Sequence, residues 1–208
     1  MNSLISEVKQ NNEDFEFYPT TKEIIDALLN DIENGLERYR KFDSILDIGA
    51  GNGKVLNALK EKFIKLYAIE KSHILRDSLD KSIFIIGTDF YNQSLFDKQM
   101  EVTFCNPPYS DYETWTSKII KESCSKYVYL VIPSRWINCQ QILDAIKYRD
   151  AKYKIIGDFT FENSEDRTAR AKVNLIRIEL SHNKDDAFDR FFKKEFSHLK
   201  EKFNEETK

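Results

Sequence analysis

The tetrapeptide Asn106-Pro107-Pro108-Tyr109 combines residue types that suit chemistry on a planar amino group. Its two prolines fix φ and remove two backbone N–H donors, so the loop presents acceptors, namely the Asn106 side-chain oxygen and the Pro107 carbonyl. We expect these acceptors to take the hydrogens of an amine and turn its lone pair toward an electrophile, while the Tyr109 ring stacks on the substrate. Such catalysis depends on positioning and electrostatics and needs no protein nucleophile. The alternative is a proline-stiffened loop without chemistry.

A second cluster, the glycine-rich turn Asp47-Ile48-Gly49-Ala50-Gly51-Asn52-Gly53, joins a predicted buried strand to a predicted helix. Glycines let a backbone turn tightly and approach a ligand closely. The spacing does not match a dinucleotide fingerprint, whose third glycine would fall at Lys54, nor a P-loop, which needs a longer gap between its glycines. The carboxylate of Asp47 would repel a pyrophosphate and suits a ligand with an amino group. We therefore expect Asp47, Gly49 and Gly51 to contact such a ligand.

Further polar residues follow the next two predicted strands. Glu70 ends one strand, where a carboxylate can accept hydrogen bonds from the ribose hydroxyls of a ligand. Asp89 follows the next strand and could accept from an exocyclic amine, and Phe90 beside it could lie against a purine ring. Acceptors for an amine, a ribose and an adenine in this order describe S-adenosylmethionine. The alternative is an acidic, glycine-rich strand edge with no ligand.

These motifs together resemble those of class I S-adenosylmethionine-dependent methyltransferases. The turn that begins at Asp47 resembles motif I (DxGxGxG), and Glu70 and Asp89 resemble the acidic motifs II and III. The tetrapeptide resembles motif IV of amino-methyltransferases, which implies that Asn106 also contacts the cofactor. Motif IV does not identify the substrate, because it occurs in enzymes that methylate adenine in DNA, bases in RNA and glutamine in release factors.

The segment Phe17-Tyr18-Pro19-Thr20 resembles motif X of adenine-N6 DNA methyltransferases, although that motif is often written with the order Thr-Pro. In that family the segment closes over the methionine end of the cofactor, which implies cofactor contacts by Tyr18, Pro19 and Thr20. The motif order X, I, II, III, IV resembles the gamma arrangement, and residues 15–180 resemble the small adenine methyltransferases of phages and mobile elements. The resemblance implies methyl transfer to adenine N6 in DNA, with the base flipped out of the duplex. Pro19 and Thr20 could instead only cap the following helix.

Basic and aromatic residues nearer the end of the chain could contact a nucleic acid. Arg135 and Trp136 follow a predicted central strand. The segment 167–177 carries basic side chains without an acidic one: Arg167, Arg170, Lys172 and Arg177. A basic loop of this kind could hold phosphate and a flipped base. We expect Arg135, Trp136, Arg167 and Arg170 to bind substrate, and a solvated hairpin is the alternative.

The elements that must position these residues alternate along the chain. Short apolar runs predict strands at 44–48, 66–70, 83–86, 102–105 and 127–132. Helical periodicity predicts helices at 20–36, 55–63, 74–79, 112–123 and 137–148, the first with a capping box from Thr20 to Glu23. Two further strands, 153–161 and 173–180, follow without an intervening helix. This order predicts an α/β fold with a doubly wound, mostly parallel seven-stranded sheet and an antiparallel edge hairpin.

Composition limits the remaining possibilities. The chain has 208 residues, of which 41% are hydrophobic, so one domain with a real core is expected. It has no apolar run of ~18 residues and no secretory signal, and its three cysteines lack a CxxC spacing, which favours a reduced, cytoplasmic protein. The three histidines show no metal-binding spacing. With a net charge of −3, the protein would have to bind nucleic acid through a local basic patch.

We divide the chain into a flexible polar segment (1–14), a methyltransferase domain (15–180) and a tail (181–208). Phenylalanines recur at helical spacing in the tail, which predicts an amphipathic helix that packs on its own domain or binds a partner. The family it resembles usually has a separate target-recognition domain, so we expect weak sequence specificity, a recognition subunit supplied by a partner, or a domain beyond this sequence. Methylation of RNA or of a protein glutamine, and a non-catalytic accessory role, are the alternative functions.

Overall fold

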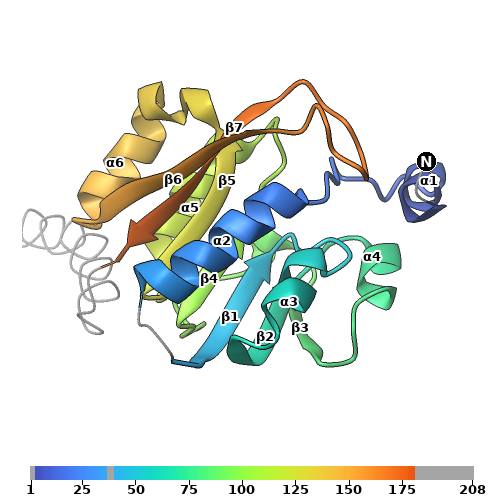
Figure 1. Ribbon diagram of the computed structural model, residues 1–208, viewed down its shortest axis with the longest axis horizontal. Coiled ribbons are helices and arrows are strands. Elements are labelled where there is room, and N and C mark those ends of the chain that lie inside the picture. The colour runs from blue at the N-terminus through green and yellow to red at the C-terminus, as the bar shows by residue number, and fades with distance from the viewer. Residues whose placement is uncertain (1–2, 37–39, 181–208) are drawn as a thin grey trace, which may run out of the picture.

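A computed structural model describes residues 3–36 and 40–180 of the chain (Figure 1). Its centre is a seven-stranded sheet in the order β3-β2-β1-β4-β5-β7-β6. The strands are β1 Phe42–Ile48, β2 Phe63–Ile69, β3 Ile83–Gly87, β4 Val102–Cys105, β5 Tyr127–Pro133, β6 Lys152–Thr160 and β7 Lys172–Glu179. Strands β1 to β5 run parallel, and β7 lies antiparallel between β5 and β6. The predicted doubly wound sheet with an antiparallel edge hairpin is confirmed.

Helices cover both faces of the sheet (Figure 1). The helices on one face are α2 (Lys22–Gly35) and α3 (Lys54–Leu59), and those on the other are α5 (Tyr112–Glu122) and α6 (Gln140–Tyr148). In strand β5, alternate side chains enter the two cores, with Tyr129 in the first and Leu130 in the second. A central strand with two buried faces has no polar side, which explains its continuous apolar sequence.

Two predicted helices have different bounds in the structure. Phe63 begins β2 instead of ending a helix, because it reaches the same core as Leu59 from the strand. The apolar spacing alone did not show whether Phe63 reaches this core from the end of the helix or from the start of the next strand. The predicted helix 137–148 is divided into a short 3-10 turn, η2 (Ser134–Asn138), and helix α6.

The N-terminal part of the chain also differs from the sequence prediction. Helix α2 begins after Thr21, and no side-chain hydrogen bond caps it, so the capping box predicted at Thr20 does not form. The segment predicted to be flexible contains helix α1 (Ser3–Gln10), whose Ile5 and Val8 are buried. Helix α1 packs against α4 (His73–Asp77), and burial of its two apolar side chains accounts for a helix in a mostly polar stretch.

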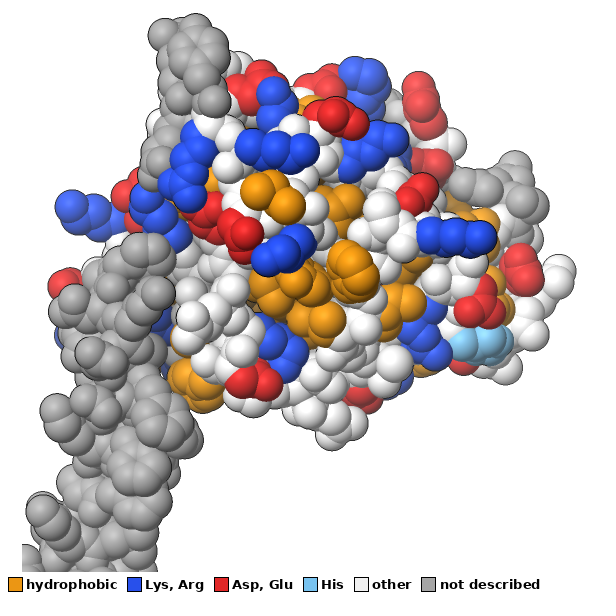
Figure 2. All heavy atoms as spheres, turned by 90° about the horizontal axis from the view of Figure 1, so that it is seen from below, with side chains coloured by type: hydrophobic (Ala, Val, Ile, Leu, Met, Phe, Trp, Pro, Cys, Tyr) orange, Lys and Arg blue, Asp and Glu red, His pale blue; other side chains and the backbone are white. Residues whose placement is uncertain are grey.

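The connection from β3 to β4 contains one short 3-10 turn, η1 (Phe90–Asn92). On strand β3 the side chain of Phe84 is 58% exposed to solvent. Figure 2 shows the face seen from below, where apolar side chains gather in the middle among interspersed basic and acidic ones. This face therefore offers no continuous basic surface among the described residues.

None of the helices within 3–36 and 40–180 has the length and apolar composition that crossing a bilayer requires. The amphipathic helix predicted within 181–208 lies outside the described residues.

Candidate active site

The glycine-rich turn and the Asn-Pro-Pro-Tyr loop meet at the carboxyl edge of the sheet. Strands β1 and β4 are neighbours, and Ile48 pairs with Cys105, so the two loops leave the sheet side by side. The strand order reverses here, which is where open α/β sheets bind ligands. A first cavity of about 300 Å³ lies beside the glycine turn, and a second of about 400 Å³ lies beside Pro107 and Tyr109. Both cavities are lined by Glu16, Tyr18 and Asn106.

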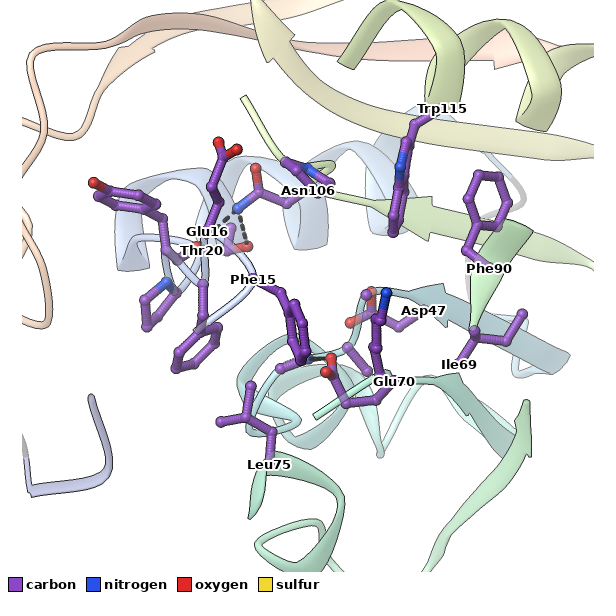
Figure 3. A pocket seen from close by; sticks show the side chains of 18 of the residues that line it. Phe15, Glu16, Thr20, Asp47, Ile69, Glu70, Leu75, Phe90, Asn106 and Trp115 are labelled. Atoms are coloured by element: carbon purple, nitrogen blue, oxygen red, sulfur yellow. Dashed lines mark hydrogen bonds between the residues drawn. The ribbon is translucent and has the colours of Figure 1, made fainter. Parts of the chain in front are cut away.

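The first cavity gathers every residue that the sequence assigned to the cofactor (Figure 3). These residues are Tyr18, Pro19, Thr20, Asp47, Gly49, Gly51, Glu70, Asp89, Phe90 and Asn106. Of the residues assigned to substrate, Tyr109, Arg167 and Arg170 line the second cavity. Arg135 and Trp136 line neither cavity. The loop therefore separates two chambers, with Pro108 facing the first and Pro107 the second.

The glycine turn is held in a conformation that other residues rarely adopt. Left-handed φ angles of 78°, 57° and 74° at Gly49, Gly51 and Gly53 carry the chain from β1 into α3. A Cβ atom on Gly51 would overlap the ring of Phe17, whereas one on Gly49 would lie 3.5 Å from Trp115, an ordinary contact. Gly51 thus serves both the turn and the close approach of Phe17 to it.

Glu70 fixes this turn from the end of β2. Its carboxylate accepts hydrogen bonds from the backbone N–H groups of Gly51 (2.7 Å) and Ser72 (2.8 Å). Burial nevertheless raises the pKa of Glu70 above its ordinary value. These bonds occupy one lone pair of each carboxylate oxygen and leave the others for a ligand. Glu70 therefore has a structural role that the sequence did not predict, and the ribose contact stays a prediction.

Asp47 carries an orphaned polar atom at the edge of the first cavity. Its side chain is only 2% exposed, and its Oδ1 atom has no hydrogen-bond partner among the described residues. Burial, together with the negative charge of Glu70, raises the pKa of Asp47 well above its ordinary value. A buried carboxylate without a partner is costly, so this position suits a ligand that brings a hydrogen-bond donor or a positive charge.

An aromatic wall closes the far side of the first cavity. Phe90 packs against Trp115 with ring centroids 4.4 Å apart, and Trp115 also lies beside Gly49. Asp89 accepts a hydrogen bond from the backbone N–H of Tyr91, and its other oxygen lies 3.6 Å from Lys71 Nζ.

Several lining residues were missed by sequence reasoning, namely Phe15, Lys71 and Trp115, and Phe17 was named only as part of the segment that resembles motif X. Lys71 directly follows Glu70, and its Nζ lies 4.9 Å from the ring of Phe15. Figure 3 shows Phe15 and Trp115 reaching into the same cavity from opposite parts of the chain. Of the three missed residues, only Trp115 offered a signal in advance, by its position in the helix after the tetrapeptide.

The side-chain amide of Asn106 is oriented by two hydrogen bonds. Its Nδ2 donates to the backbone carbonyl of Tyr18 (3.1 Å) and to Oγ1 of Thr20 (3.3 Å), as the dashed lines in Figure 3 show. Because both amide hydrogens are used, the Oδ1 atom is left as an acceptor with no partner among the described residues. This is the orientation that the predicted role of Asn106 requires, and it gives Thr20 a use other than helix capping.

Tyr109 is held by a residue that the sequence had assigned to substrate. Arg135 Nη1 donates to the Tyr109 hydroxyl (2.7 Å), and the guanidinium lies 4.8 Å from the centre of the Tyr109 ring and 5.3 Å from that of Tyr112. Tyr109 itself is 38% exposed and presents its ring to the second cavity. Arg135 thus acts on the orientation of Tyr109 rather than lining a cavity.

The predicted substrate contact of Trp136 is wrong. Its side chain is fully buried, and its Nε1 donates to Asn174 Oδ1 (3.0 Å) beneath the edge hairpin. The turn η2 sends Arg135 outward and Trp136 inward, and the sequence alone did not distinguish the two directions.

The basic segment 167–177 does not form one continuous patch. Arg177 is buried and paired with Asp31 (2.6 Å). Arg167 donates to Asp14 and to a backbone carbonyl, so its charge is already paired. The side chains of Arg170 and Lys172 are exposed and make no hydrogen bond or ion pair to another described residue, although the backbone of Lys172 pairs with β6. Only these two cations of the segment are open to a phosphate.

Comparison with known proteins identifies the fold. No protein-family model and no curated protein matches the sequence. A 23S rRNA methyltransferase, ErmE, aligns with a TM-score of 0.61 and 12% identity over 79% of this chain and 70% of its own. A dimethyladenosine transferase from Plasmodium falciparum gives 0.65 and 14% over 83% and 65%. The plantazolicin methyltransferase BpumL, solved with SAH, gives 0.54 and 16% over 86% and 89%.

This chain has the class I methyltransferase fold. It spans 65% of the length of the Plasmodium protein and 70% of ErmE. At these identities the likeness concerns the architecture alone, and the chemistry depends on the residues of the two cavities.

Proposed function

We propose that this protein transfers a methyl group from S-adenosylmethionine to the exocyclic N6 amine of adenine in DNA. The observation that carries the proposal is the amide of Asn106, which lines both cavities and has its oxygen free because its nitrogen is bonded to Tyr18 and Thr20. An acceptor between a cofactor chamber and a base chamber is what methylation of an amine requires.

The first cavity fits the cofactor. The partnerless oxygen of Asp47 suits its ammonium group, the remaining lone pairs of Glu70 suit its ribose hydroxyls, and the wall of Phe90 and Trp115 suits its adenine. When bound, S-adenosylmethionine supplies an electrophilic methyl group. The contribution of the protein is to place the amine and to exclude water from it.

The second cavity fits a base taken out of its stack. Its walls are largely apolar, with Phe161, Val131 and Val173 among the lining residues, and Tyr109 offers a flat face. Asn106 Oδ1 and the Pro107 carbonyl accept the two N–H hydrogens of the amine, which draws its lone pair out of conjugation with the ring. The ring of Tyr109 stacks on the base and fixes its plane, as in enzymes that act on flipped bases.

Two exposed cations near the second cavity, Arg170 and Lys172, are available to contact phosphates. Arg170 lines this cavity, and Lys172 begins strand β7 two residues later. So small a patch gives weak electrostatic binding, since affinity for DNA grows with the number of phosphates contacted. We therefore propose weak sequence specificity, or a recognition subunit supplied by a partner.

RNA is the second candidate substrate. The resemblance of the segment Phe17–Thr20 to motif X favours DNA, whereas two similar structures are a 23S rRNA methyltransferase and a dimethyladenosine transferase. Both substrates would present the same amine to Asn106, so the site chemistry is common to them.

The proposal is tested with S-adenosylmethionine labelled in its methyl group. The protein is incubated with unmethylated DNA, with unmodified ribosomal RNA and with a glutamine-containing release factor, and label is counted in each. We expect label in DNA, and none with the Asn106→Ala variant. Label in RNA alone would replace DNA by the second candidate, label in protein alone would replace both, and a folded, cofactor-binding protein that labels nothing would favour an accessory role.

A further inference from the structure

Residues 13–20, here called the strap, run between the two cavities and are tied to the rest of the protein at several points. Glu13 accepts from the backbone N–H of His73 (2.9 Å), and Glu16 accepts from that of Ser110 (3.1 Å), next to the tetrapeptide. Tyr18 and Thr20 accept from Asn106. The strap therefore touches the cofactor side and the catalytic loop together.

Arg167 contacts the strap at three residues, through two hydrogen bonds and one ring. Its Nη1 donates to Asp14 Oδ1 (2.6 Å) and to the backbone carbonyl of Phe17 (2.7 Å), and its guanidinium lies 3.9 Å from the centre of the Tyr18 ring. The side chain is 17% exposed. A planar, delocalised guanidinium suits this combination of stacking and hydrogen bonding, which a lysine cannot reproduce.

Tyr18 connects Arg167 to the catalytic amide. Its ring is covered by Arg167, and its backbone carbonyl accepts one of the two hydrogen bonds that orient Asn106. The loop that carries Arg167 is itself anchored, since neighbouring Asp166 pairs with Lys54 beside the glycine turn (2.7 Å). A displacement of Arg167 would thus reach Asn106 through a single intervening residue.

We propose that Arg167 is a positioning residue, which sets the orientation of the Asn106 amide through Tyr18 and fixes the β6–β7 loop against the strap. This inference rests on the proposed function and deepens it. It assigns Arg167 to the placement of the amine acceptor rather than to a phosphate. It also links the wall of the base chamber to the segment that borders the cofactor chamber.

Two arginines on the same loop make a matched pair for the test. Arg167→Gln removes the paired arginine, and Arg170→Gln removes the exposed one, while both lose one positive charge. For Arg167→Gln we expect kcat to fall by about 10- to 100-fold, the effect of a misplaced reacting group, with KM for DNA and the salt dependence of binding unchanged. For Arg170→Gln we expect KM to rise and the slope of log K against log salt to decrease by about one.

A second readout does not depend on activity. The side-chain amide signals of Asn106, assigned by their loss in Asn106→Ala, are followed by NMR in the ligand-free protein. We expect them to move in Arg167→Gln and to stay in place in Arg170→Gln. Arg167→Lys keeps the charge without the planar stack, and should move these signals as well and restore kcat only in part.

The two readouts separate the inference from the proposed function. If Arg167→Gln lowers the salt slope by about one and keeps kcat, Arg167 is a phosphate ligand and the inference is overturned. Unmoved Asn106 signals in a folded Arg167→Gln protein would overturn it too. If the unaltered protein methylates no nucleic acid, the proposed function fails, and the NMR comparison still decides whether Arg167 orients Asn106.

Discussion

Substitution of Gly51 by alanine should destabilise the protein more than the same change at Gly49, although both residues have left-handed backbones. The φ angles are 57° at Gly51 and 78° at Gly49, so alanine is strained at either position. The two sites differ in what a Cβ atom meets. At Gly51 it would overlap the ring of Phe17, and at Gly49 it would lie 3.5 Å from Trp115.

The expected loss of stability has two parts, the strain of a left-handed backbone and the overlap with a neighbouring side chain. A left-handed conformation costs an L-residue roughly 1–2 kcal/mol, which applies to both variants. Overpacking adds about 1–3 kcal/mol, which applies to Gly51→Ala alone. For a chain of 208 residues, 1 kcal/mol lowers the melting temperature by about 2–4 °C. Gly51→Ala should therefore melt about 2–12 °C below Gly49→Ala.

Thermal unfolding of the ligand-free proteins, followed by circular dichroism, measures this difference. A third protein, Phe17→Ala combined with Gly51→Ala, identifies its source, because removing the ring removes the clash and leaves only the backbone strain. In the Phe17→Ala background the two glycine substitutions should then cost the same. Equal melting temperatures for Gly51→Ala and Gly49→Ala in the presence of Phe17 would refute the packing of the strap on the glycine turn.

Three further predictions concern single side chains. Because burial raises the pKa of Asp47, the ligand-free protein should lose stability as the pH rises from about 4 through that raised pKa, and Asp47→Asn should lack this loss. Melting curves across pH check it, and parallel profiles for the two proteins would contradict it. Tyr109→Phe should keep most of the activity, whereas Tyr109→Ala should lower the activity roughly 5- to 150-fold, the equivalent of ~1–3 kcal/mol of stacking on one base. Steady-state kinetics on DNA measure both effects, and equal losses in the two variants would argue against stacking. Trp136→Phe should lower the free energy of unfolding by about 1–3 kcal/mol, since it leaves the Asn174 oxygen with one donor fewer, while kcat per folded molecule stays unchanged. Denaturant titration and an activity assay test this prediction, and a loss of kcat without a loss of stability would show that Trp136 contributes to the active site.

The sequence was most informative where one physical constraint acts alone. Strand β4 has the predicted bounds, 102–105, because a short apolar run between a polar stretch and two prolines leaves no other extent. The residues of the first cavity were predictable because parallel strands end at the same edge, which brings Asp47, Glu70 and Asn106 together from distant parts of the chain.

Prediction failed where a side chain could serve two environments. Phe63 fits a helix or a strand facing the same core, and Trp136 fits a cavity wall or a buried position beneath the hairpin. The basic segment looked like a phosphate site because Asp14, which pairs with Arg167, and Asp31, which pairs with the buried Arg177, lie more than a hundred residues away in sequence. Long-range pairing of this kind leaves no local pattern.

Methyl transfer to adenine through Asn106 is tested most directly by mass spectrometry of nucleosides from unmethylated DNA that has been treated with the protein and S-adenosylmethionine. We expect N6-methyladenine from the unaltered protein and none from Asn106→Ala, although calorimetry should show that this variant still binds the cofactor. N6-methyladenine formed equally well by Asn106→Ala, or a methyl group found on a ring carbon of cytosine instead, would contradict it.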